Sequence, residues 1–274
     1  TTEIYTLSLH DALPISTTVA IPDGGFGDVT LGKLNADDYP DVVFADELND
    51  RVEILFGDGL GGFVSDDKHD LGATPRRAIL ALVNGDAHPD VITINNTARS
   101  LSLLIGNGDG TFQTPTAINV QERPTDALTS LLNDDEHPDL IVTLESGGSH
   151  VAVLLNNGDG TFATPVLYPT GASPQRVAAG DVNGDGTPDI VTSNQAGDGV
   201  SVLMAKSDGT LLPKVDHATG DNPRGLLLVD LNGDTNPDLL VAHVGANHHA
   251  VLLNDGLGGF APDRKSTRLN SSHL

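Results

Sequence analysis

The stretch Asp181-Val-Asn-Gly-Asp-Gly-Thr-Pro-Asp189 carries side-chain oxygens at its first, third, fifth and ninth positions and a glycine at its sixth. Such a loop can curl until these oxygens converge, and the carbonyl of Thr187 can supply another. Ca²⁺ takes roughly six to eight oxygen ligands in a flexible geometry, and the glycine permits the positive φ of a sharp turn. An EF-hand would continue to a glutamate at position twelve, whereas Thr192 lies there in an apolar run. The stretch therefore predicts a calcium-type loop between two strands.

The same loop occurs five times, at a spacing of 49 or 50 residues. Residues 230–238 form a second complete copy, in which Thr235 replaces the glycine. Three weaker copies, whose first position is Lys or Leu, span 33–41, 82–90 and 131–139. One Asp- and Gly-rich loop would be typical of any turn. Five loops in phase indicate an internal repeat.

Each repeat also contains a Gly-rich hairpin turn, such as IGNGDGTF at 105–112. Short runs rich in Val, Ile and Leu, bounded by Gly, Asn, Asp and Pro, are strand signals, and no window shows sustained helical periodicity. In the second repeat we expect strands at 76–81, 91–95, 101–105 and 112–120. Four short antiparallel strands per unit of about 40–50 residues predict propeller blades, which stack around an axis to bury their faces.

Together the two motifs resemble the FG-GAP/VCBS repeats of integrin α-chain propellers and of many secreted bacterial proteins, over essentially all of 17–262. The resemblance implies an all-β fold, a β-propeller of four-stranded antiparallel blades, often seven, with calcium loops between the first and second strands. Five repeats then represent a truncated ring. The expected blades are 26–74, 75–123, 124–173, 174–222 and 223–262, with 17–25 as the end of a preceding blade.

Both ends depart from the repeat. Residues 1–16 and 263–274 resemble translated sequencing-adapter sequence, so neither is expected to be native, and both are excluded from the fold prediction. Residues 17–262 are then expected to be an internal piece of a longer gene. The lack of a signal peptide consequently says nothing about localisation.

The charge excludes some function classes. The chain has 14 Lys and Arg against 38 Asp and Glu, a net charge of −24, which is unsuitable for binding nucleic acid. The absence of cysteine excludes a disulfide framework and thiol chemistry. No apolar run is long enough to span a membrane. The many acids in the repeated loops suit a divalent cation.

Carried over residue by residue, the resemblance implies calcium ligands in both complete loops. These are Asp181, Asn183, Asp185, Thr187 (carbonyl) and Asp189, and Asp230, Asn232, Asp234, Asn236 (carbonyl) and Asp238. The weaker loops retain Asn35, Asp37 and Asp41, Asn84, Asp86 and Asp90, and Asn133, Asp135 and Asp139. The alternative is that the loops are Asx-turns that need no ion. Convergent carboxylates repel one another without a cation, which favours calcium. Extracellular modules bind calcium at about 10⁻⁴–10⁻³ M, so such sites predict an extracellular or cell-surface location.

Connections in an antiparallel blade alternate between its two ends. The calcium-type loops and Gly-rich turns should therefore share one end, and the other connections should share the opposite end. That opposite end is expected to carry Arg51, Arg76, Arg77, Arg99, Arg123, Arg176 and Arg224. These arginines either pair with the surrounding acids or form a face that binds an anionic glycan or an acidic protein segment.

The sequence favours a calcium-stabilised, non-catalytic module for adhesion or ligand binding in a larger secreted or cell-surface protein. Its partner would be an extracellular protein or carbohydrate. One alternative is a calcium-dependent lectin, although the lack of Trp leaves few aromatic platforms for sugars. The other is the propeller of a polysaccharide lyase-like enzyme, which would need a basic residue beside Arg or His in a central cleft. No repeat breaks its pattern to supply that group.

Overall fold

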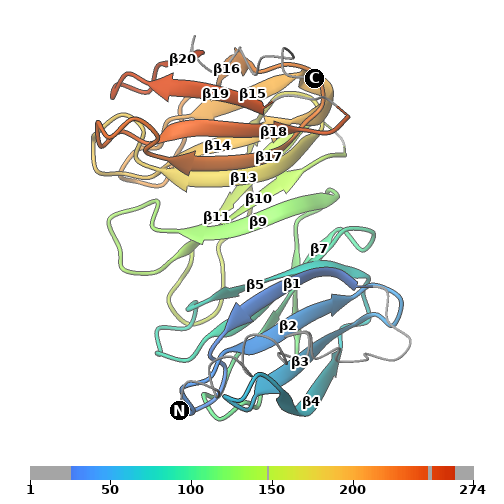
Figure 1. Ribbon diagram of the computed structural model, residues 1–274. Helices are drawn as coiled ribbons and strands as arrows, with labels where there is room; N and C mark the ends of the chain where they lie inside the picture. Colours follow the sequence, from blue (N-terminus) through green and yellow to red (C-terminus); the bar gives the residue numbers. More distant parts are fainter. Residues whose placement is uncertain (1–25, 147, 246–248, 263–274) are drawn as a thin grey trace, which may run out of the picture.

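The computed structural model describes residues 26–146, 148–245 and 249–262 (Figure 1). These residues form twenty strands in five four-stranded antiparallel sheets, with one 3₁₀ turn, η1, at Gln195–Gly197. The two adapter-like ends and the expected remnant at 17–25 lie outside the described residues. In the part of the chain that is described, there is no helix long and apolar enough to cross a membrane.

The strands divide evenly among the sheets. The first sheet contains β1 (Phe26–Gly32), β2 (Asp41–Asp46), β3 (Arg51–Gly57) and β4 (Phe63–Asp70). The second contains β5 (Pro75–Ala81), β6 (Asp90–Asn95), β7 (Ser100–Leu104) and β8 (Thr116–Asn119). The third contains β9 (Pro124–Ser130), β10 (Asp139–Leu144), β11 (His150–Leu154) and β12 (Val166–Pro169). The fourth contains β13 (Pro174–Gly180), β14 (Asp189–Asn194), β15 (Gly199–Leu203) and β16 (Val215–Ala218). The fifth contains β17 (Pro223–Val229), β18 (Asp238–His243), β19 (His249–Asn254) and β20 (Phe260–Pro262).

Each sheet is a meander whose strands pair in chain order. The first strands of successive sheets, β1, β5, β9, β13 and β17, contact one another in turn. In Figure 1 the first sheet lies at the bottom, the third in the middle and the fifth at the top. The predicted all-β propeller of four-stranded antiparallel blades is confirmed, and the first strand of each blade is its inner strand.

The calcium-type loops and the Gly-rich turns lie at the same end of the blades, as predicted. The amide of Gly160, in the Gly-rich turn of the third blade, donates to the carbonyl of Val83 in the loop of the second, at 3.1 Å. Asp134 in the third loop likewise donates its amide to the carbonyl of Ser207 in the fourth blade. The side chain of Asn156 also reaches the Val83 carbonyl. Hydrogen bonds at this end therefore join neighbouring blades.

The hydrophobic core lies between the blades. Each of the four buried clusters combines apolar residues of two consecutive sheets. The second residue of the calcium-type loop belongs to this interface and is buried in the first four loops, where it is Leu34, Val83, Leu132 and Val182. In the fifth loop the equivalent Leu231 is 46% exposed. The second residue of each of the first four loops is therefore a core residue that packs against the following blade.

The fourth strand of the second blade is shorter than predicted. The sequence suggested a strand over 112–120, but β8 covers Thr116–Asn119. Phe112 forms only an isolated bridge with Gly106. Pro115 lies between the two and has no N–H to donate to a strand ladder. In the first blade no proline interrupts the equivalent stretch, and β4 runs from Phe63 to Asp70.

Candidate functional site

The ninth residue of every calcium-type loop is a buried aspartate that accepts backbone N–H groups. In the third blade, Asp139 accepts from the amide of Leu132 at 3.1 Å and from the amide of Asn156 at 2.9 Å. The same pair of bonds recurs at Asp41, Asp90, Asp189 and Asp238. Burial raises the pKa of Asp189 to about 6 despite these bonds. The ninth carboxylate thus ties the loop to the end of the third strand.

The third, fifth and seventh positions form a chain of Asx-turns. In the fourth loop the Asn183 side chain donates to Asp185 Oδ2 at 2.9 Å and accepts from the Asp185 amide at 2.8 Å. The amide of Thr187 then donates to Asp185 Oδ1 at 2.8 Å. The other four loops repeat this pattern at Asn35 and Asp37, Asn84 and Asp86, Asn133 and Asp135, and Asn232 and Asp234.

The first position separates the two complete loops from the three weaker ones. Asp181 accepts from the amides of the fourth, fifth and sixth loop residues. Asp230 accepts from the amides of Gly233 and Thr235, which lowers the pKa of its carboxyl. In these two loops the fourth and sixth residues both have positive φ, as the glycine at the sixth position predicted for Gly186. The sixth residue of each weaker loop does not.

Thr235 is held in a conformation that suits glycine. Its φ is 74°, in the left-handed region that β-branched residues rarely adopt. Such a backbone costs of the order of 1–3 kcal/mol. Thr235→Gly is therefore expected to raise the free energy of unfolding by about 1 kcal/mol after the greater unfolded-state entropy of glycine is counted. Urea denaturation measures this change in the free energy of unfolding. The control is Thr187→Gly in the fourth loop, which should be destabilising because φ is not positive at Thr187. A loss of stability in Thr235→Gly would contradict the argument.

Whether the loops hold calcium depends on the donor set. Carboxylate, amide and carbonyl oxygens are present in the predicted order, and they suit a hard cation. Within the described residues, however, no three Asp, Glu or His side chains come together as a metal site. The carboxylates of Asp181 and Asp189 instead accept N–H groups. The donor chemistry fits calcium, while the loops close through hydrogen bonds of their own, so the ligand set stays a prediction.

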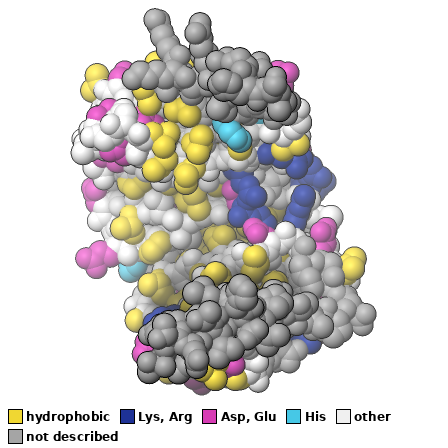
Figure 2. Space-filling model, viewed as in Figure 1, with side chains coloured by type: hydrophobic (Ala, Val, Ile, Leu, Met, Phe, Trp, Pro, Cys, Tyr) yellow, Lys and Arg dark blue, Asp and Glu magenta, His cyan; other side chains and the backbone are white. Residues whose placement is uncertain are grey.

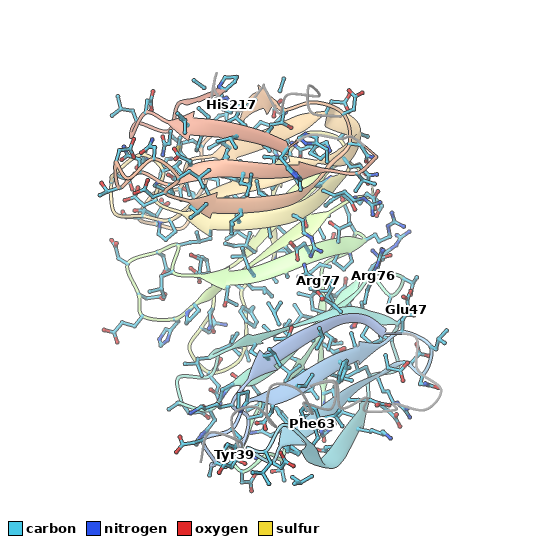
Figure 3. The ribbon with its side chains drawn as sticks, viewed as in Figure 1. Tyr39, Glu47, Phe63, Arg76, Arg77 and His217 are labelled. Carbon is cyan, nitrogen blue, oxygen red and sulfur yellow. The ribbon has the colours of Figure 1, made fainter. Side chains whose placement is uncertain are left out.

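Four of the predicted ligand-face arginines lie at the start of the inner strands. Arg76, Arg77, Arg176 and Arg224 line a pocket of about 310 Å³, to which all five inner strands contribute. The remaining lining residues are Gly27, Asp28, Thr125, Gln175 and Gly225. Figure 3 places Arg76 and Arg77 between the lower and upper sheets, where Lys and Arg side chains gather in Figure 2. We call this cavity the axial pocket.

The other three arginines lie at the predicted end of the blades but outside the axial pocket. Arg123 is exposed and forms an ion pair with Glu145. Arg99 is exposed in the connection between β6 and β7 and has a φ of 55°. Arg51 pairs with Asp46 and Glu53 within the first sheet. The structure therefore brings together Arg76, Arg77, Arg176 and Arg224 and separates the others from them.

Comparison with solved structures shows a shared fold. A lectin from Agrocybe aegerita that recognises non-reducing terminal N-acetylglucosamine is 22% identical, with a TM-score of 0.58, and the match covers 86% of this chain and 64% of that one. A functionally unknown protein from Desulfotomaculum acetoxidans is 13% identical, also with a TM-score of 0.58, over 80% and 63% of the two chains. The chain thus spans less than two thirds of the length of each.

The sequence comparison is more specific. No curated protein sequence matches the chain, but residues 132–192 match the family model of the FG-GAP-like repeat. This segment runs from the calcium-type loop of the third blade to β14 of the fourth. It includes the buried ninth aspartates Asp139 and Asp189. The match to the FG-GAP-like repeat covers residues 132–192 of this five-bladed stack, and it agrees with the resemblance predicted from the sequence.

Proposed function

We propose that the chain is a non-catalytic, ligand-binding β-propeller module of a larger secreted or cell-surface protein, stabilised by calcium. The partner is an extracellular protein or a carbohydrate, and the role is adhesion or ligand capture. The FG-GAP-like repeat at 132–192 and the propeller fold support a scaffold that presents a binding surface.

The start of the inner strands provides the main support for a binding function. Four inner strands begin with a buried proline, at Pro75, Pro124, Pro174 and Pro223, and the loop aspartates repeat in all five blades. The two residues after each proline differ from blade to blade, and all of them except Asp126 line the axial pocket. Regular framework positions surrounding a group of varied polar side chains are what a ligand-binding site on a repeat scaffold requires.

Calcium is proposed for the loops that begin with Asp181 and Asp230. The first aspartate is partly exposed in the fourth loop and exposed in the fifth, and in both loops the fourth and sixth residues have positive φ. Strain such as that at Thr235 is common in ligand clamps. An ion there would be held by the first, third, fifth and ninth side chains and by the seventh carbonyl, and it would neutralise the carboxylates.

Calcium is accordingly expected to stabilise the protein. At a free concentration a hundred times the dissociation constant, each site adds about 2.7 kcal/mol to the free energy of unfolding. Asp181→Ala and Asp230→Ala should each remove one such increment. The measurement is thermal and urea unfolding in calcium and in EDTA.

Asp134→Ala is the matched control, because Asp134 is an exposed carboxylate in the third loop outside the predicted ligand positions. It should retain the full calcium effect. Identical unfolding in calcium and in EDTA would exclude the calcium sites and leave the loops as Asx-turns.

A lectin is the second candidate, favoured by the fold shared with the Agrocybe aegerita protein. Titration with N-acetylglucosamine, with glucose as the control, tests it. Saturable binding that is selective for N-acetylglucosamine would support a lectin. Equal or undetectable binding of both sugars would remove that support.

A further inference from the structure

The inner strands begin with a β-bulge that brings neighbouring side chains to the axis. In the second blade Pro75 pairs with Asn95 and Arg77 with Ile94, so that Arg76 has no partner in the ladder. The same irregularity leaves Thr125, Gln175 and Arg224 out of their ladders. In a regular strand, consecutive side chains point to opposite faces. Bulges re-aim side chains, and here both residues after the proline line the pocket in the second, fourth and fifth blades.

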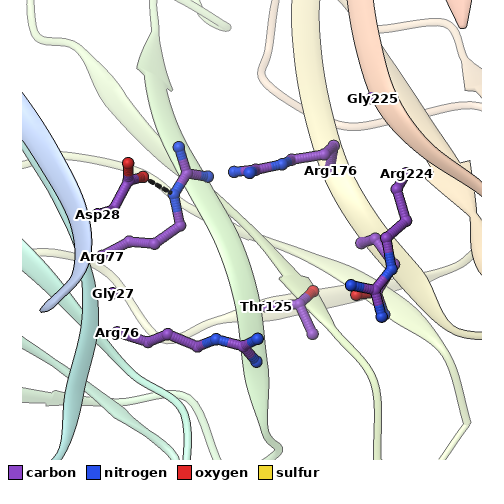
Figure 4. A pocket seen from close by; sticks show the side chains of 9 residues that line it. Gly27, Asp28, Arg76, Arg77, Thr125, Arg176, Arg224 and Gly225 are labelled. Carbon is purple, nitrogen blue, oxygen red and sulfur yellow. Dashed lines mark hydrogen bonds and ion pairs between the residues drawn. The ribbon is translucent and has the colours of Figure 1, made fainter. Parts of the chain in front are cut away.

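The axial pocket is cationic in a strongly anionic protein. The chain carries a net charge of −24, yet four arginines and a single acid, Asp28, line this cavity. Figure 4 shows the arginine side chains extending into it from opposite walls, Arg76 and Arg77 from one and Arg176 and Arg224 from the other. The positive charges of these arginines repel one another across the pocket, so the arrangement favours an anion between them.

Part of this charge is already neutralised within the fold. Arg77 Nε contacts Asp28 Oδ2 at 2.5 Å, and Arg77 Nη1 is paired with Asp126 Oδ1. Asp126 also accepts the amides of Ala127 and Val177. Burial lowers the pKa of Arg77, and the charge of Arg176 adds to the effect. Arg77 and its two carboxylates therefore act as a structural link between the first three blades.

The remaining arginines keep donors for a ligand. Arg176 Nη1 lies 3.7 Å from Asp126 Oδ1, too far for a hydrogen bond. Arg224 donates to the neutral side chain of Gln195 at 3.3 Å. Arg76 is exposed and pairs with no carboxylate in the part of the chain that the structure describes. Three guanidinium groups are thus only partly engaged, and a guanidinium offers two parallel N–H donors that match the oxygens of an oxyanion.

We propose that the axial pocket binds a small ligand through one oxyanion group, a carboxylate, sulfate or phosphate, held by Arg76, Arg176 and Arg224. Thr125 and Gln175, also in the lining, supply neutral hydrogen-bonding groups for the rest of the ligand. The volume of about 310 Å³ is at the small end for ligand sites, and it suits one sugar acid or one amino-acid side chain. This inference deepens the proposed ligand-binding function and rests on it.

The test is isothermal titration of the full chain at low salt. The probes are galacturonate and its neutral counterpart galactose, N-acetylaspartate, inorganic sulfate and inorganic phosphate. Galacturonate is expected to bind at least about tenfold more tightly than galactose, because charge-assisted hydrogen bonds are lost in the neutral sugar. The relative affinities of the acidic probes identify the source of the oxyanion. Equal binding of galacturonate and galactose, or binding of no anion, would overturn the proposal.

Variants locate the site. Arg76→Gln combined with Arg224→Gln should weaken anion binding at least about tenfold without changing the melting temperature appreciably. Neither side chain forms an ion pair with a described carboxylate, and Arg224 acts on Glu145 only through its charge. Arg123→Gln is the control, because Arg123 pairs with Glu145 outside the pocket. Equal loss in the control and the double variant would mean that the anion binds the general surface and would refute the site.

The outcomes separate this inference from the proposed function. If no anionic probe binds but N-acetylglucosamine binds selectively, the axial site is wrong while the binding module stands. If calcium has no effect on unfolding but the anion still binds through these arginines, the axial site stands while the calcium-stabilised scaffold fails.

Discussion

Replacing Asp139 with alanine is expected to lower the free energy of unfolding by about 2–6 kcal/mol. The carboxylate is fully buried and accepts the amides of Leu132 and Asn156. Each amide left without an acceptor in a buried setting costs about 1–3 kcal/mol. Asp139→Asn should cost less, because its amide oxygen still accepts one N–H group while its NH₂ group faces the other. Urea denaturation in EDTA measures both changes without a contribution from any bound ion.

Asp135→Ala is the matched control for Asp139. Asp135 is an exposed carboxylate in the same loop, and it also accepts two hydrogen bonds, from Asn133 and the amide of His137. Water can replace its bonds, so its loss should cost less than about 1 kcal/mol. If Asp135→Ala destabilises the protein as much as Asp139→Ala, burial is not the source of the effect and the structural role of the ninth aspartate is wrong.

Much of the architecture was predictable because the same loop and turn motifs occur in all five repeats. The loops fix where the first strand ends and the second begins, and the Gly-rich turns fix the end of the third. The structure has β5 at Pro75–Ala81 and β6 at Asp90–Asn95, within one residue of the ranges expected from the sequence. The fourth strand was less predictable, since a strand signal after Phe112 concealed the interruption at Pro115.

The role of the ninth aspartate could not be read from the loop alone. The spacing of Asp181, Asn183, Asp185 and Asp189 suits both a cation and a set of N–H donors. In the structure Asp189 is inaccessible and accepts the amides of Val182 and Ala205, while its role as a calcium ligand stays a prediction. That burial depends on how the loop packs against the end of the third strand, which no local pattern encodes.

The sequence predicted that the arginines of the axial pocket share one end of the blades, but it did not predict which of them meet in a pocket. Simple strand alternation would send Arg76 and Arg77 to opposite faces, and the bulge after Pro75 prevents this. The pairs of consecutive residues near the start of the inner strands, such as Arg76 and Arg77, recur about every fifty residues along the chain. Their convergence is visible only once the blades are stacked. The recurrence of a proline followed by polar residues is the signal that could have pointed to it.

The packing of neighbouring blades gives the other large expected effect. Leu132, the second residue of the third calcium-type loop, is fully buried and belongs to the cluster that includes Ile190 and Leu203 of the fourth blade. Leu132→Ala removes apolar contacts and leaves a cavity between the two blades. Substitutions of this kind cost about 2–5 kcal/mol. The expected result is a loss of this size in the free energy of unfolding, measured by urea denaturation.

Leu231 provides the matched comparison within the same chain. It is the same residue type at the same loop position, but it is 46% exposed. Because water already reaches much of its side chain, Leu231→Ala should cost less than about 1 kcal/mol. A large difference between the two variants would show that the loop residue stabilises the protein by packing against the next blade. Equal losses would mean that leucine acts within its own loop, and the inter-blade interface would then have to be held mainly by the strands and by hydrogen bonds such as that from Asn156 to Val83.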